Sequence, residues 1–192
     1  MKEVLEVFEK DVKFIQADKE VFYTDIGYGE KFVTISLSVF DQESLIFYSS
    51  LQALKEIIKR FLNIKTPKGF RTRVFIYRRE KFENFINAYQ SINLQNIIYN
   101  INLDYAGTGS NTIGIYKMEE EDIKKVIKSI EITDTSISLI NIKEPLTPNL
   151  KSLVFLKDEN NLLIEKLDKN YYDSYLINKS VVFLTNFLNK VI

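Results

Sequence analysis

All five arginines of this 192-residue chain lie between residues 60 and 79, although its lysines are spread along the whole sequence. The segment 55–81 holds ten basic residues and only two acids, Glu56 and Glu80, so it carries a formal charge of +8 in a chain with a net charge of zero. A guanidinium group binds oxyanions through a planar, bidentate fork and also stacks on aromatic rings. This segment is therefore the first candidate functional surface, and it would bind an anionic partner.

Alternation along a predicted strand at 71–78 sharpens this hypothesis. Side chains of a strand point alternately to its two faces, so one face carries arginines and aromatic rings while the other is apolar at its centre. The predicted binding residues are Arg60, Lys65, Lys68, Arg71, Arg73, Phe75, Tyr77, Arg78 and Arg79. Arginines beside aromatic rings are also typical of surfaces that bind single-stranded nucleic acid. A structural alternative is that the strand pairs with the protein's own acids and packs its arginine stems on aromatic rings.

The composition removes much of the usual catalytic repertoire. The sequence has no cysteine and no histidine. Disulfides, thiolate nucleophiles, Ser-His-Asp triads and zinc sites built from cysteine or histidine are therefore excluded. Carboxylates, lysine, tyrosine, hydroxyl groups and carboxylate-bound hard metals remain. We predict no catalytic residue, no metal site and no cofactor, and an enzyme is the less favoured interpretation.

Two other patterns invite a functional interpretation but favour a structural one. The loop that contains Gly107 and Gly109 lacks the third glycine and the following helix of a dinucleotide-binding loop, so we interpret it as a hairpin connection. Asp122 and Lys124 resemble the acid–lysine half of a metal nuclease site, but they open a helix instead of lying on a strand. Acids in the first turn of a helix suit its dipole, so this acidic run is interpreted as a helix start.

The elements that must position these residues follow from the spacing of apolar side chains. Spacings of three and four predict helices, and alternation predicts strands. The predicted helices cover about 3–16, 51–61, 82–89, 119–130 and 171–191, and the predicted strands include 32–40, 45–49, 71–78, 96–105 and 112–118. Three repeats of hairpin-then-helix order favour an α+β fold: a mixed, mostly antiparallel sheet built from hairpin–helix units, with four to five helices packed on it.

The chain is predicted to form a single domain over residues 1–192. Pro145 and Pro148 mark a subdomain break near 143–149, and residues 150–192, too few to fold alone, are expected to pack back as a hairpin plus a C-terminal helix. The wide apolar arc of that helix suits packing in its own core, and homo-oligomerisation through it is an alternative. No signal peptide or membrane span is recognisable, so we expect a cytoplasmic protein without membrane contact.

These patterns favour a non-catalytic interaction protein, such as an adaptor, inhibitor or accessory subunit. It would bind an acidic protein partner through the arginine and aromatic surface around residues 60–81. The alternative is a single-stranded nucleic-acid-binding protein that uses the same surface. A third hypothesis is an enzyme based on carboxylates or lysine, for which the sequence names no residues.

Overall fold

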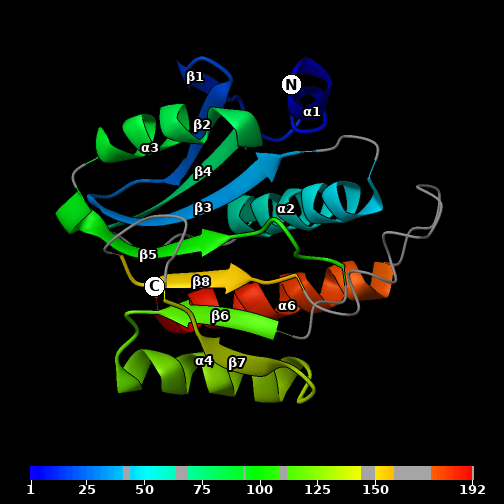
Figure 1. Cartoon of the computed structure of the whole chain (residues 1–192), viewed down its shortest axis with the longest axis vertical. Helices are drawn as coiled ribbons and strands as arrows, with labels where there is room; N and C mark the ends of the chain where they lie inside the picture. The colour runs from blue at the N-terminus through cyan, green and yellow to red at the C-terminus, as the bar shows by residue number, and fades with distance from the viewer. Residues whose placement is uncertain are drawn as a thin grey trace.

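The computed structural model describes residues 1–40, 44–63, 69–92, 94–108, 112–143, 150–157 and 174–191. They form one eight-stranded sheet with helices on it (Figure 1). The strands are β1 (Ile15–Asp18), β2 (Val21–Gly27), β3 (Lys31–Val39), β4 (Phe70–Arg78), β5 (Ile97–Asn102), β6 (Thr112–Tyr116), β7 (Ser138–Asn141) and β8 (Ser152–Phe155). The helices are α1 (Lys2–Glu6), α2 (Leu45–Asn63), α3 (Phe82–Gln90), α4 (Glu120–Thr133) and α6 (Ser174–Val191), with short 3-10 turns at Arg79–Lys81 and Leu94–Asn96. The α+β class and the mixed sheet are confirmed.

The strand order across the sheet is β1-β2-β4-β3-β5-β8-β6-β7. The centre is parallel, because β3 pairs with β4 and β5, and β5 pairs with β8, in the same direction. Antiparallel pairs join β1 to β2, β2 to β4 and β6 to β8, whereas β7 lies parallel to β6 at the edge. The carboxyl ends of β3, β4, β5 and β8 therefore meet at one edge of the sheet.

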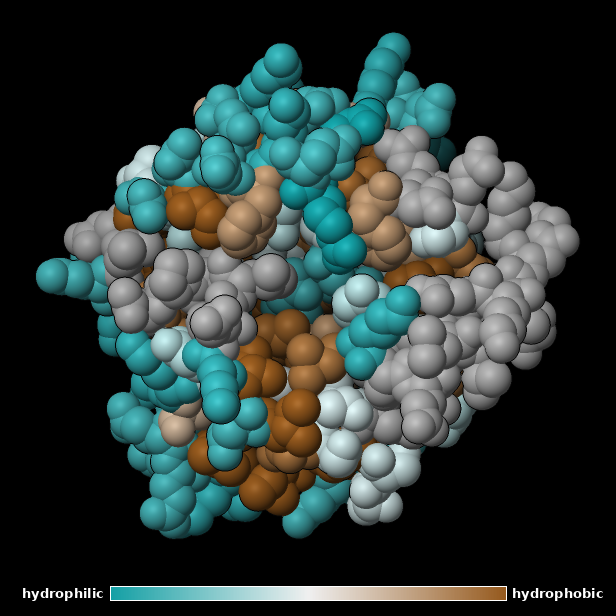
Figure 2. Space-filling model, viewed as in Figure 1, coloured by the Kyte–Doolittle hydropathy of each residue, from teal (hydrophilic) through white to brown (hydrophobic). Residues whose placement is uncertain are grey.

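Two cores lie on opposite faces of the sheet. The alternation predicted for β3 sends Ile35 and Leu37 into the larger core, which α2, α4 and α6 cover. On the other face, α3 packs Phe85 and Tyr89 over the β2 and β4 side of the sheet. Figure 2 shows a hydrophobic area over β6, β7 and β8. Ile140, on β7, is half-exposed. Among the described residues, no helix combines the length and apolar character needed to cross a membrane.

Three local predictions are wrong. The helix predicted over 3–16 ends at Glu6, and β1 begins at Ile15. The other two errors concern how the strands are connected. Residues 45–49 were expected as a return strand, but they begin α2, because parallel β3 and β4 require a crossover that a hairpin cannot supply. The glycine-containing loop was expected as a hairpin connection, but β5 and β6 are not neighbours, since β8 lies between them. The second strand of the hairpin predicted after residue 150 lies outside the described residues.

The described residues of this last part of the chain, 150–157 and 174–191, belong to the sheet and the larger core. β8 lies inside the sheet between β5 and β6, and α6 packs against α2 and α4. The apolar arc of α6, including Val181, Leu184 and Phe187, is buried in the chain's own core. Homo-oligomerisation through this helix stays a prediction.

Candidate functional site

The two arginines at the centre of the predicted binding surface are paired inside the protein. Arg73 donates from Nε to Asp25 Oδ1 at 2.6 Å and from Nη2 to Asp25 Oδ2 at 2.7 Å. Arg71 donates from Nη1 to Asp25 Oδ2 at 3.2 Å. The Arg73 guanidinium also lies 4.5 Å from the ring centroid of Tyr23 and 5.1 Å from that of Phe32. The structure thus shows, for these two residues, the internal pairing that the sequence offered as an alternative.

The aromatic residues between the arginines are core residues. Phe75 and Tyr77 share a face with Arg71 and Arg73, as alternation predicts, but each is only 1% exposed. Tyr77 stacks on Phe85 of α3 with the ring centroids 4.1 Å apart. Burial and the nearby Asp104 carboxylate raise the pKa of Tyr77, so its hydroxyl stays protonated.

The other predicted cations are dispersed over the fold. Arg78 lies 2.6 Å from Glu20 in an ion pair between Nε and Oε1. Arg60, on α2, donates from Nη2 to Asn178 Oδ1 of α6 at 3.1 Å. Lys65 and Lys68 lie outside the described residues.

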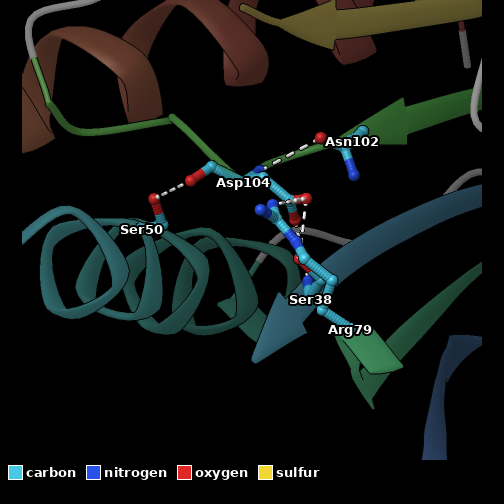
Figure 3. Close-up of polar contacts among 5 residues, drawn as sticks. All are labelled: Ser38, Ser50, Arg79, Asn102 and Asp104. Atoms are coloured by element: carbon cyan, nitrogen blue, oxygen red, sulfur yellow. Dashed lines mark hydrogen bonds and ion pairs between the residues drawn. The ribbon is translucent and has the colours of Figure 1, made fainter. Parts of the chain in front are cut away.

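Arg79 belongs to a different site, at the carboxyl ends of three parallel strands (Figure 3). Ser38 is the last residue but one of β3, Arg79 directly follows β4, and Asp104 lies two residues after the end of β5. Asp104 Oδ2 accepts hydrogen bonds from Ser38 Oγ at 2.7 Å and Arg79 Nη2 at 3.1 Å, and its Oδ1 accepts from the backbone N–H of Ser38 at 2.8 Å. Arg79 Nε also donates to Ser38 Oγ at 3.3 Å. We call this set of three residues the strand-end cluster.

The position of the strand-end cluster is the usual one for a ligand site in an open α/β sheet. Ligands bind beyond the carboxyl ends of strands at the point where neighbouring connections leave towards opposite faces. Here the chain leaves β3 for α2, on the face of the larger core, and leaves β4 for α3, on the other face. The topology therefore makes this edge of the sheet the expected position of a ligand-binding site.

Burial divides the cluster into a fixed and an accessible part. The side chain of Asp104 is 6% exposed, whereas that of Arg79 is 47% exposed and stacks 4.4 Å from the ring centroid of Phe40. Burial lowers the pKa of Arg79, but the charge of Asp104 and hydrogen bonds with Asp104 and Tyr105 outweigh it and raise that pKa. The cluster thus offers a permanently charged guanidinium whose orientation is set by a buried carboxylate.

The loop after β5 is held against the two long helices. Ser50, on α2, donates from Oγ to the carbonyl oxygens of Asp104 at 2.9 Å and Ala106 at 3.0 Å. Gly107 N donates to Ser180 Oγ of α6 at 2.8 Å. Gly107 has a φ of +75°, and a Cβ there would lie 2.8 Å from the carbonyl oxygen of residue 49. Glycine is therefore required by a close backbone approach, which keeps Asp104 in a fixed loop.

A second polar cluster joins α4 to the sheet. Asp122 accepts hydrogen bonds from the hydroxyl of Tyr99 and from Lys151 Nζ at 2.8 Å, and Lys151 also lies 3.1 Å from Glu119 Oε1. Burial raises the pKa of Asp122, but the bonds from Lys151 and Tyr99 outweigh it and hold that pKa below its usual value. Burial, followed by the bond to Asp122, raises the pKa of Tyr99. These groups satisfy one another, as expected of a structural tie.

Two residues of the strand-end cluster, Ser38 and Asp104, were missing from the predicted site. Asp104 is recognisable as an acid just before a glycine loop, but that signal needs the knowledge that β3, β4 and β5 run parallel, and the expected sheet was mostly antiparallel. Among the described residues, no group of three or more acids, histidines or cysteines could hold a metal ion.

No protein-family model matches this sequence, and no curated protein matches it. Solved structures match the fold. A Peptidase M28 precursor from Shewanella amazonensis SB2B has a TM-score of 0.65 at 11% identity, over 87% of this chain and 43% of that one. An aminopeptidase from Aneurinibacillus sp. strain AM-1 has a TM-score of 0.66 at 8% identity, over 88% and 47%. A glutaminyl cyclase from an Acidobacteriales bacterium has a TM-score of 0.59 at 8% identity, over 97% and 82%.

These similarities place the chain in a class of fold shared with peptidases and a cyclase. Identities this low show the fold alone, and the chain spans less than half the length of the first two structures. The predicted non-catalytic interaction protein, with its nucleic-acid-binding alternative, is nevertheless contradicted, because the neighbouring structures are enzymes. Missing histidine and cysteine limit the side-chain chemistry, whereas the fold depends on the apolar pattern, so the composition could not predict which folds this chain resembles.

Proposed function

We propose that this chain is a peptide-directed enzyme with its site at the strand-end cluster. The observation that carries the proposal is the convergence of Ser38, Arg79 and Asp104 beyond the carboxyl ends of three parallel strands. The fold is shared with proteins described as a peptidase and an aminopeptidase, which supports a peptide as the substrate class. Reactions at a peptide carbonyl need a group that binds the carbonyl oxygen and stabilises the charge that develops on it.

Arg79 is the residue for that role. A guanidinium has five N–H donors. The bonds to Ser38 and Asp104 engage Nε and one proton of Nη2, and the hydrogen bond with Tyr105 engages a further donor. Because about half of the side chain is exposed, the guanidinium can meet a carbonyl oxygen from the open side of the sheet edge. Its charge is present before the substrate arrives, so no reorganisation is needed as negative charge develops.

Asp104 and Ser38 act as positioning residues. The Asp104 carboxylate accepts from both Arg79 and the Ser38 hydroxyl, and that hydroxyl accepts in turn from Arg79 Nε. The three bonds form a closed ring that restrains the guanidinium in two directions, while Phe40 supports it from one side. A small displacement of a catalytic group costs a large part of its effect, so losing either partner should lower the rate more than the affinity.

The test is a turnover assay with the twenty unblocked tripeptides Xaa-Ala-Ala, with products identified by mass spectrometry. For tripeptides that are turned over, Arg79→Gln should lower kcat by about 100-fold or more, the usual effect of removing one oxyanion donor. Arg60→Gln is the matched control, because Arg60 bonds to α6 and lies outside the cluster. The proposal is refuted if no tripeptide is turned over, or if Arg79→Gln retains the full kcat.

A further inference from the structure

Two asparagines of β5 have buried side-chain nitrogens without a hydrogen-bond partner among the described residues. Asn100 is 0% exposed and Asn102 is 1% exposed, and each has an unpaired Nδ2. An unpaired buried donor costs about 1–3 kcal/mol, so natural proteins keep few of them, and each one needs an explanation.

The orientation of Asn102 is determined by its neighbour. Its Oδ1 accepts a hydrogen bond from the backbone N–H of Asp104 at 3.2 Å. A backbone N–H can only donate, so the oxygen must face it, and the unpaired atom is the nitrogen. For Asn100 the contact is with the Thr34 hydroxyl at 3.0 Å, which can donate or accept. Of these two asparagines, therefore, Asn102 is the one whose two Nδ2 N–H donors have a defined direction.

The amide nitrogen of Asn102 lies on the face of β5 that also carries the strand-end cluster (Figure 3). Figure 3 shows the amide nitrogen of Asn102 on the same side of β5 as the carboxylate of Asp104, which holds Arg79. On the neighbouring strand, Ser36 is paired in register with Asn102, and Ser38 follows two residues later on the same face. Polar side chains thus continue inward from the half-exposed guanidinium to the unpaired amide.

We propose that Asn102 determines specificity by donating from Nδ2 to a carbonyl oxygen of the bound peptide. This inference rests on the proposed function, which places a peptide at Arg79. The amide is neutral and stands near the negative charge of Asp104, so the inner position favours an uncharged carbonyl over a carboxylate. An unpaired buried donor discriminates strongly, because it gains its hydrogen bond only from a ligand that brings an acceptor.

The experiment measures binding instead of turnover. Dissociation constants for the Xaa-Ala-Ala tripeptides are obtained from ¹⁵N–¹H chemical-shift titrations of the whole chain, and Asn102→Asp identifies the side-chain amide signal of Asn102 by its loss. Binding should shift that signal downfield. Asn102→Ala should weaken binding about 5-fold, and Asn102→Asp about 10-fold or more because it sets an oxygen against the ligand carbonyl.

Asn100→Ala is the matched control, since Asn100 also has a buried amide with an unpaired nitrogen. It lies two residues before Asn102 on the same face of β5, about 6.6 Å along the strand. The substitution should leave the dissociation constant unchanged. If tripeptides bind, Arg79→Gln lowers their turnover, and Asn102→Ala leaves their dissociation constants unchanged, the role of Asn102 is refuted while the proposed site stands. If no tripeptide binds, both fail. If Asn102→Asp does not fold, the affinity of Asn102→Ala and the shift of the wild-type amide signal still decide whether Asn102 donates to the peptide.

Discussion

Replacing Asp104 by Asn tests whether a buried carboxylate holds the strand-end cluster together. The substitution keeps the shape, and Oδ1 can still accept from the backbone N–H of Ser38. It removes the charge and turns the acceptor that faces Arg79 Nη2 into a donor. Hydrogen bonds to charged groups contribute about 1.5–3 kcal/mol each, and three of them are weakened or lost. We expect the free energy of unfolding to fall by about 2–4 kcal/mol, or the melting temperature by about 5–12 °C for a chain of this length.

The contribution of the ion pair itself is smaller. Arg79 is half-exposed, so water screens its interaction with Asp104 and can solvate it when the partner is lost. In a double-mutant cycle with Asp104→Asn and Arg79→Gln, we expect a coupling energy of about 1–2 kcal/mol. Urea unfolding of the four proteins measures it. Glu6→Gln is the control, since the exposed pair of Glu6 with Lys2 is 3.9 Å long and should contribute less than about 0.5 kcal/mol.

Two results would refute this reasoning. If the effects of the two single substitutions add within about 0.3 kcal/mol, Arg79 and Asp104 do not interact in solution. If Asp104→Asn costs no more than Glu6→Gln, the carboxylate is not buried in the way the structure shows.

Three further predictions concern other parts of the fold. Asp25→Asn should lower the free energy of unfolding by about 1–3 kcal/mol in urea, because it breaks the bidentate pair with Arg73; an effect below about 0.5 kcal/mol would count against that pair. The hydrogen bond from Lys179 lowers the pKa of Asp134 to about 2, below its unfolded value near 3.9. The ionised Asp134 carboxylate therefore stabilises the fold by about 1–2 kcal/mol above about pH 5, and this contribution is lost as the pH falls to 2. The stability difference between wild type and Asp134→Asn should accordingly vanish in acid. Gly29→Ala should cost at least about 3 kcal/mol, seen as loss of cooperative thermal unfolding, because its Cβ would lie 2.1 Å from the backbone carbon of the residue before β4.

Local periodicity was sufficient to predict much of the fold. The alternation in β3 predicts its core face correctly, because Ile35 and Leu37 face the larger core, but it does not predict that the small polar residues on the other face are buried too. The acidic start of α4 was also predicted correctly, since the first turn of the helix contains Glu120, Glu121 and Asp122. These features depend on neighbours in the sequence, which a single sequence displays.

Local periodicity could not predict whether neighbouring strands run parallel or antiparallel. Residues 45–49 are apolar and aromatic and suit a strand by propensity, but the parallel pairing of β3 with β4 requires a crossover helix there. The same error concealed the site. Ser38, Arg79 and Asp104 are far apart in the sequence, and they converge only if three strands end at the same edge. Pairing between distant segments is decided by tertiary packing, which local patterns do not encode.

For some of the arginines between residues 60 and 79, the structure shows contacts that a lysine could not make. Three of these side chains each combine two contacts that need a flat, forked cation: Arg73 binds both oxygens of Asp25 while stacking on Tyr23, Arg79 binds two acceptors while stacking on Phe40, and Arg71 binds Asp25 over a ring. A lysine ammonium is a point charge and cannot make a bidentate pair and a stacked contact together. The difference between the two ends of β4 is then one of exposure. Arg73, more deeply buried, closes a structural contact, whereas Arg79 keeps about half of its surface open at the edge where ligands bind in such sheets. Substitution by lysine should accordingly lower mainly the stability at Arg73, and the proposed function adds that it should lower mainly kcat at Arg79.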